Sequence, residues 1–101
     1  MNIGKAIKEL RKRQSLSQGA LAAKAGMTQA ALSQIENGKR PGKETLKRLS
    51  AALGISESLL HLMGLEREDV PEQRSSLYDD IFPVIQDLVA KLATPRDEKA
   101  N

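Results

Sequence analysis

Two short amphipathic helices that meet at a glycine constrain the fold of this chain more than any other feature. Residues 17–37 read SQGALAAKAGMTQAALSQIEN, and apolar side chains recur at helical spacing on both sides of Gly26. Because glycine reaches positive φ without a Cβ clash, we expect the chain to turn sharply there. Ser17 and Thr28 are suitable N-caps, since a hydroxyl can accept a backbone N–H of the first helical turn. The pattern predicts one helix before the glycine and a second one after it.

The second helix, predicted over residues 29–37, carries amide and small side chains on its exposed side. A side-chain amide offers the paired donor and acceptor that match an adenine edge in the DNA major groove. In a helix-turn-helix, the second helix reads bases while the first lies across the DNA backbone. An ordinary αα-hairpin inside a helical bundle is the alternative interpretation. On the first interpretation, the base-reading side chains are Gln29, Ala30, Ser33 and Gln34.

The sequence LSQGALAAKAGMTQAALSQIENGKRP, residues 16–41, resembles the Xre-type (Cro/cI-type, lambda-repressor-like) DNA-binding domain of phage and bacterial repressors. The resemblance extends from residue 3 to residue 63, about three-fifths of the chain. Its most specific parts are Ser17-Gln18, the step from Ala22 to Gly26, Thr28-Gln29 and Ile35-Glu36-Asn37-Gly38. It implies an all-α, five-helix bundle that binds double-stranded DNA.

The resemblance also implies contacts with the DNA backbone. Gln18 would lie at a helix N-terminus, where free N–H groups and the helix dipole favour a phosphate. The loop 38–43, GKRPGK, has three cations. Phosphate contacts set register and affinity without reading sequence. Arg40 has the alternative of entering a narrow minor groove. The residues predicted to contact the backbone are Gln18, Thr28, Asn37, Lys39, Arg40 and Lys43.

A structural ion pair is a further implication of the resemblance. The family often pairs an arginine of the first helix with a glutamate of the recognition helix, and the matching positions here are Arg11 and Glu36. A carboxylate next to DNA would otherwise repel it, so we interpret Glu36 as structural. A plain exposed charge is the alternative.

Apolar residues spaced three and four apart predict further helices over residues 3–14 and 44–53, and another that is capped by Ser56. The charge is unevenly divided: residues 1–50 have eleven Lys/Arg and three Asp/Glu, a balance of +8, whereas residues 51–101 have five and ten, a balance of −5. This asymmetry favours a polyanion-binding first half.

The composition also predicts several absences. Cysteine is missing and there is a single histidine, so we expect no disulfide, no metal site, no cofactor and no catalytic residue. No apolar run approaches the roughly 20 residues of a membrane span, and the first residues do not resemble a signal peptide. We therefore expect a soluble cytoplasmic protein that is not an enzyme and has no membrane contact.

The predicted organisation is a DNA-binding domain over residues 1–63, an acidic linker over 64–75, a C-terminal helix over 76–93 and a frayed tail over 94–101. Ser76 can cap the helix. Pro83 should either kink it or move its start to about Phe82. The apolar residues proposed to contact a partner are Tyr78, Ile81, Phe82, Ile85, Leu88, Val89 and Leu92.

Three binding partners remain possible for this apolar stripe. They are the chain's own bundle, the same helix of a second subunit, and a different protein, as in antitoxins that hold their toxin with a tail. A dimer suits a DNA reader, because half-sites about 34 Å apart need a two-fold protein. The sequence thus predicts a dimeric, sequence-specific transcriptional repressor. The alternatives are an antitoxin and a protein-interaction module that does not bind DNA. Such a module would not need Gln29, Gln34, Lys39 and Arg40, all of which are present here.

Overall fold

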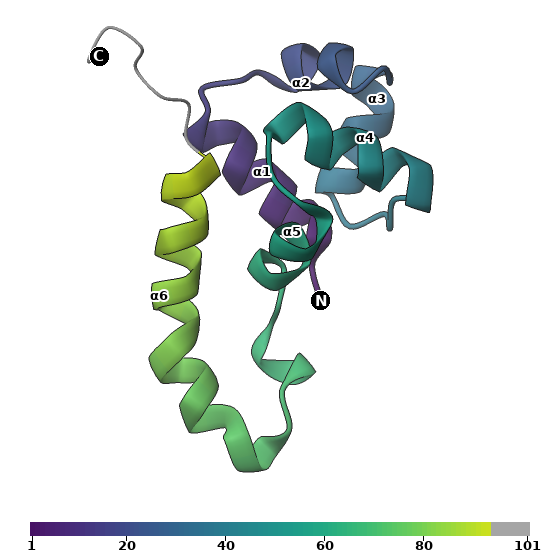
Figure 1. Ribbon diagram of the computed structural model, residues 1–101. Helices are drawn as coiled ribbons and strands as arrows, with labels where there is room; N and C mark the ends of the chain where they lie inside the picture. The colour runs from purple at the N-terminus through teal and green to yellow at the C-terminus, as the bar shows by residue number, and fades with distance from the viewer. Residues whose placement is uncertain (94–101) are drawn as a thin grey trace, which may run out of the picture.

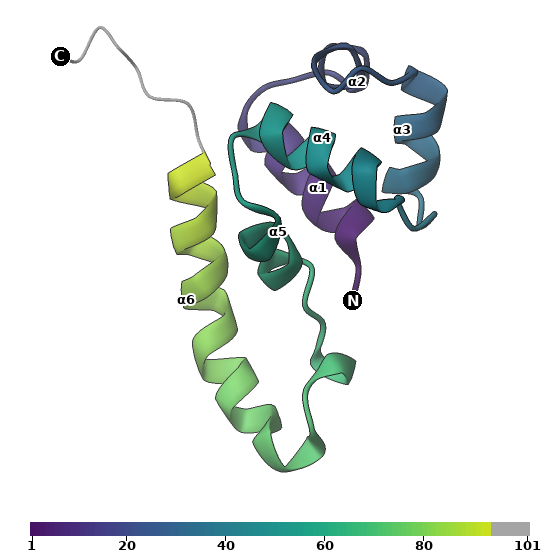
Figure 2. The ribbon, with the colours of Figure 1, turned by 45° about the vertical axis from the view of Figure 1, so that its right-hand side comes forward.

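The computed structural model describes the backbone of residues 1–93 and the side chains of these residues except Ser75, Val89, Ala90, Leu92 and Ala93. The tail predicted over residues 94–101 lies outside the described residues. The described part is all-helical, and five short helices form a bundle with a sixth helix along one side (Figures 1 and 2). The helices are α1 (Ile3–Arg13), α2 (Gln18–Lys24), α3 (Gln29–Glu36), α4 (Lys43–Leu53), α5 (Glu57–Met63) and α6 (Ser75–Ala93).

The predicted N-caps of α2, α3 and α5 are confirmed. The Ser17 hydroxyl oxygen accepts the backbone N–H of Ala20 at 3.0 Å, and the Thr28 hydroxyl oxygen accepts that of Ala31 at 3.1 Å. Ser56 caps α5 in the same way. Gly26, between α2 and α3, has a φ of 68°. The local signals of the sequence therefore set the turn as predicted.

The core of the bundle is aliphatic. The apolar faces of the first five helices converge on fully buried leucines and isoleucine, with alanines where helices approach closely. Such burial contributes roughly 1.5–3 kcal/mol for each large side chain. The residues with almost no exposed surface are Ile7, Leu10, Leu21, Leu32, Leu49, Leu53 and Leu60.

Gly4 allows α1 to pack directly on the C-terminal end of α3. A Cβ atom at this position would overlap the carbonyl oxygen of Ile35, so only glycine permits the observed distance between the two backbones. The approach fixes the end of α3 from one side. It was not predicted, because it joins residues that are far apart in the sequence.

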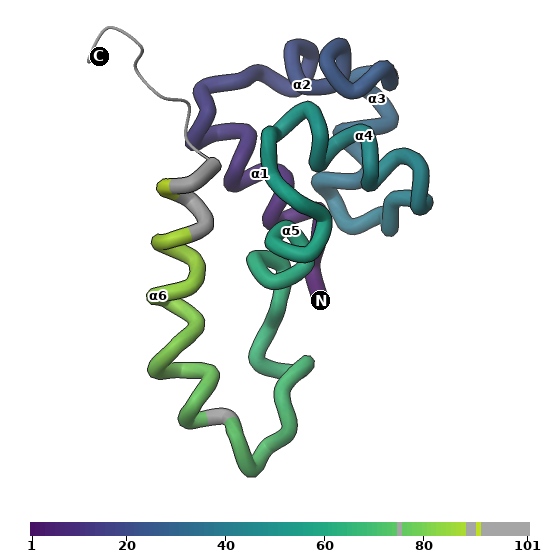
Figure 3. Tube along the Cα trace, viewed as in Figure 1, coloured from purple at the N-terminus to yellow at the C-terminus, as the bar shows by residue number. Residues whose placement is uncertain are grey.

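The predicted linker over residues 64–75 contains two 3₁₀ turns, η1 (Arg67–Asp69) and η2 (Glu72–Arg74). Figure 3 shows the chain running away from α5 through this segment before α6 returns along the bundle. The amino group of Met1 lies 2.6 Å from a carboxylate oxygen of Asp69 and 3.2 Å from one of Glu66. The hydrogen bond with Asp69 raises the pKa of this amino group, and the same bond lowers the pKa of Asp69.

One expectation about α6 was wrong, and one alternative of another is excluded. The helix begins at Ser75, directly after η2, so Ser76 lies within its first turn and is not the N-cap. Of the two outcomes expected for Pro83, the shift of the helix start to Phe82 is excluded, because Pro83 lies inside α6, and the kink stays a prediction. Although proline removes one backbone hydrogen bond, Phe82 is buried on the bundle and the hydroxyl of Tyr78 donates to the carbonyl of Leu65 at 3.2 Å. These contacts hold the part of the helix that precedes the proline.

The close approach at Gly4 gives a first prediction. Gly4→Ala should lower the free energy of unfolding by about 1–3 kcal/mol, because α1 must move away from the backbone of α3. Gly19→Ala is the matched control, since its new Cβ would meet only ordinary contacts at 3.6 Å or more and alanine favours a helix. Urea denaturation measures both variants, and equal stabilities would contradict the packing constraint.

Candidate nucleic-acid interface

The outer face of α3 carries most of the predicted base-reading residues. Gln29, Ala30 and Gln34 are exposed and Ser33 is half-buried, whereas the opposite face of the helix buries Leu32 and Ile35 in the core. Helix α6 lies along the other side of the bundle in both views and leaves this face uncovered (Figures 1 and 2). The amides are therefore presented to solvent on a helix whose inner face is fully packed.

A buried ion pair holds the C-terminal end of α3. The guanidinium of Arg11 donates from Nε to Glu36 Oε2 at 2.8 Å and from Nη2 to Glu36 Oε1 at 3.1 Å. The Glu36 side chain is only 2% exposed, so it is not a plain surface charge. Arg11 also donates from Nη1 to the carbonyl of Leu16 at 2.9 Å. The predicted structural pairing is confirmed.

Gln18 belongs to the same network. Its side-chain amide is half-buried and donates to Glu36 Oε1 at 3.1 Å. The carboxylate of Glu36 on α3 is thus bound by side chains of α1 and α2 together. The predicted phosphate contact of Gln18 stays a prediction, and it would use the second amide N–H or the backbone N–H at the start of α2.

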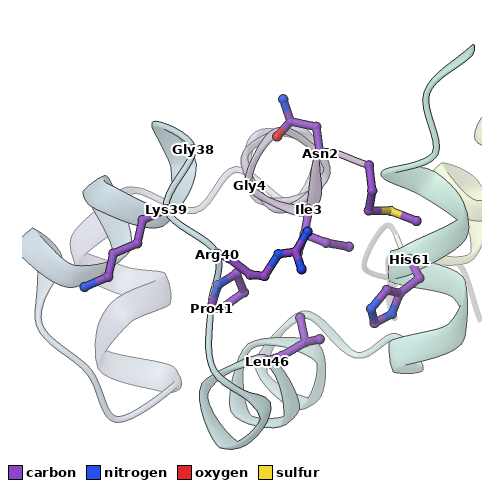
Figure 4. A pocket seen from close by; sticks show the side chains of 10 residues that line it. Asn2, Ile3, Gly4, Gly38, Lys39, Arg40, Pro41, Leu46 and His61 are labelled. Carbon is purple, nitrogen blue, oxygen red and sulfur yellow. The ribbon is translucent and has the colours of Figure 1, made fainter. Parts of the chain in front are cut away.

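The loop after α3 points its cations in different directions. Lys39 Nζ lies 3.4 Å from Gln34 Oε1, which keeps this ammonium beside the outer face of α3. Arg40 lies across a hollow of about 390 Å³ that His61 and Leu46 also line, and the side chain of Lys39, which borders the same hollow, extends away from Arg40 (Figure 4). Asn37, Lys43 and Thr28 are exposed. The side chains of Arg40 and Lys39 therefore extend in different directions from the same loop.

The apolar residues predicted for partner contact on α6 fall on two different faces. Tyr78, Phe82 and Ile85 face the chain's own bundle: Phe82 is buried, Ile85 packs against the core, and the two aromatic rings stack with centroids 4.7 Å apart. Ile81 and Leu88 are exposed. The side chains of Val89 and Leu92 lie outside the described residues.

Two exposed apolar residues of α6 were missed. Leu77 and Val84 lie on the outer side of the helix with Ile81 and Leu88. Their spacing was visible in the sequence as a second series at intervals of four, three and four residues. It overlaps the predicted series, so periodicity alone did not separate the two.

Other kinds of site are not visible in the described residues. Within residues 1–93, no group of three or more His, Asp or Glu side chains is arranged to hold a metal ion. Among the helices that the structure describes, none is long and apolar enough to cross a membrane.

Comparison with known proteins identifies the class. A helix-turn-helix family model matches residues 7–60, more than half of the chain. The chain therefore belongs to the Xre/lambda-repressor-like helix-turn-helix family, whose members are DNA-binding regulators, and the predicted family and all-α bundle are confirmed. The family is typically non-enzymatic.

A curated relative extends the similarity beyond this domain. Over 93 residues the chain is 31% identical to RghRB, an uncharacterised HTH-type transcriptional regulator of Bacillus subtilis (strain 168), and the alignment covers 87% of this chain and 67% of the relative. No solved structure matches the chain significantly.

The buried network gives the second prediction. Glu36→Ala should lower the free energy of unfolding by about 3–5 kcal/mol, because it leaves the Arg11 guanidinium without a partner in a buried site. Glu44→Ala is the control: its pair with Arg48 is exposed at 3.8 Å and should contribute less than about 0.5 kcal/mol. Urea denaturation measures both. Similar losses of unfolding free energy in the two variants would show that the buried pair stabilises the fold no more than the exposed pair does.

Proposed function

We propose that this protein is a dimeric, sequence-specific transcriptional repressor that reads the DNA major groove with α3. The supporting observation is the outer face of α3, where exposed amides project from a helix clamped by the buried Arg11–Glu36 pair. A helix held in this way presents its side chains to DNA without first having to order its backbone. Repression follows when the bound protein occupies the DNA that a polymerase needs.

Each base-reading residue has a distinct chemical role in this proposal. The amides of Gln29 and Gln34 offer paired hydrogen bonds to the N6 and N7 atoms of adenine, and Ala30 packs against a thymine methyl group. Ser33 donates or accepts a hydrogen bond beside them. Gln34 exchanges its 3.4 Å contact with Lys39 for a base on binding.

The backbone contacts come from the residues that surround α3. Lys39 and Lys43 supply positive charge, while Thr28, Asn37 and Gln18 supply neutral donors. These contacts position the helix and carry no sequence information directly. Arg40 joins them by leaving the hollow beside α1, and its side chain is exposed and long enough to rotate.

Selection of bound DNA from a random library, at stated salt, tests the whole proposal. We expect a two-fold symmetric site with half-sites about 34 Å apart or a multiple of that spacing. Transcription in vitro from a promoter that overlaps the selected site should fall when the protein is added. Recovery of no preferred sequence would contradict base reading, and increased transcription would contradict repression.

Gln29→Ala should reduce affinity for the selected site by about 1–3 kcal/mol at one base pair and relax the preference there. The loss is local because only one pair of hydrogen bonds to a base disappears. Binding to each single-base variant of the site, measured by fluorescence anisotropy, gives the result. A uniform loss across all variants would show that Gln29 does not read a base.

Lys39→Ala should weaken binding to all DNA sequences alike. It should also reduce the magnitude of the slope of log K against log salt by about 1, because one fewer counterion is released. Lys91→Ala removes the same charge from α6, on the other side of the bundle, and should leave the slope unchanged. Equal slopes for the wild type and Lys39→Ala would remove this lysine from the phosphate contacts.

A further inference from the structure

Helix α6 has a second apolar face that its own bundle does not cover. Leu77, Ile81, Val84 and Leu88 follow one another at intervals of four, three and four residues and are 50%, 43%, 65% and 56% exposed. We name these four residues the outer stripe. The other apolar face, with Tyr78 and Phe82, already packs on the bundle. The helix therefore has one face that packs on its own domain and one that has no partner among the described residues.

The outer stripe is a contiguous apolar surface, unlike the single apolar residues that are scattered over most protein surfaces. Four half-exposed aliphatic side chains in succession cover three turns of one helix, and a contiguous apolar patch of a few hundred Å² usually marks an interaction site. Helix α6 contacts α5 and α1, and Ile85 of its inner side packs against the core. Among the described helices, no other lies beyond α6 in either view (Figures 1 and 2). Within the described residues, no element covers the outer stripe.

We propose that the outer stripe pairs with the outer stripe of a second copy of this chain, with the two α6 helices parallel around a two-fold axis. Intervals of four and three residues are those of the a and d positions of a two-stranded coiled coil. Ile81 and Leu88 take the a positions, and Leu77 and Val84 take the d positions. Leu77 at d with Ile81 at a is the combination that favours two strands, whereas Val84 at d with Leu88 at a is the reverse. This pairing would form the dimer of the proposed function, and it rests on that proposed function.

The acidic residues beside the stripe favour the parallel orientation. Asp80 and Asp87 both flank the same edge of the stripe, at the g positions. In antiparallel helices, g positions face each other, so each of these aspartates would lie beside an aspartate of the other copy. In parallel helices, g faces e, and Asp80 lies beside Ile85 instead. Like charges placed together disfavour the wrong pairing.

The size of the stripe predicts a reversible dimer. Standard stable interfaces bury about 800 Å² on each partner, and four half-exposed side chains supply less than that. Free protein should therefore exchange between monomer and dimer with concentration. DNA with two half-sites raises the effective concentration of the second copy and favours the dimer.

Sedimentation equilibrium without DNA, over a concentration series, tests the interface. The wild type should show monomer and dimer, and Leu77→Asp should weaken the dimer by at least about 100-fold, since a carboxylate would be buried without a partner. Ser76→Asp is the matched control: it adds the same charge one residue away, at an exposed position outside the stripe. Leu77 is half-exposed, so circular dichroism should show both variants folded.

A single cysteine tests the orientation, because the chain has none of its own. Parallel helices place residue 88 opposite its own copy, so Leu88→Cys should form a disulfide-linked dimer under mild oxidation. In an antiparallel pair with Leu77 opposite Leu88, the two copies of residue 88 would lie about 16 Å apart, and Leu88→Cys would not cross-link. In that arrangement the double variant Leu77→Cys/Leu88→Cys would.

Three results would overturn the proposal: a wild type that stays monomeric at every concentration, a dimer that survives Leu77→Asp, or cross-linking only in the double variant. The first would leave the stripe to a different protein, such as a toxin held by its antitoxin. None of these three results tests base reading. Base reading is measured separately, as the fluorescence anisotropy of DNA with one half-site when the Leu77→Asp variant binds it. Loss of half-site binding by the folded wild type would instead contradict the proposed function.

Discussion

The carboxylate of Glu36 is the point at which the three helices around the interface are joined. It receives three N–H donors, two from Arg11 on α1 and one from Gln18 on α2, while its own backbone ends α3. Charges buried to this extent are tolerated only when their hydrogen bonds are complete. Among the described residues, no buried side-chain nitrogen or oxygen lacks a partner. The requirement for complete pairing therefore restricts how α1, α2 and α3 can be arranged.

This restriction matters because α3 is too short to be stable alone. A helix of eight residues falls below the roughly 12–15 residues at which isolated helices become marginal in water. Its order comes from the Thr28 cap, the buried Leu32 and Ile35, and the contact with Gly4. All of these contacts lie on the inner side or at the ends of α3. Substitutions on the outer side of α3 should therefore have little effect on stability.

The sequence predicted the features that depend on neighbouring residues, and it failed where distant contacts decide. Ser17, Thr28 and Gly26 act within one helical turn, so their residue types sufficed. The Gly4 contact and the direction of Arg40 depend on elements that are remote in sequence. The series beginning at Leu77 shares Ile81 and Leu88 with the predicted series beginning at Tyr78. Only the position of the bundle reveals that these two residues are exposed. Pro83 did not move the start of α6 because contacts on its N-terminal side outweigh one lost hydrogen bond.

In the proposed dimer, the two faces of α6 would couple assembly and DNA reading without shared residues. The inner face of α6 packs on the bundle, and α6 and α3 lie on opposite sides of that bundle (Figure 1). Under the proposed pairing, a second copy therefore covers none of the amides. A weak dimer then makes occupancy of a two-fold site rise more steeply than in proportion to protein concentration, since two monomers must meet on one site. A stronger interface would remove that steepness, because the dimer would already exist at low concentration. Four half-exposed aliphatic residues, without a larger buried core between the subunits, suit a regulator that responds to its own abundance.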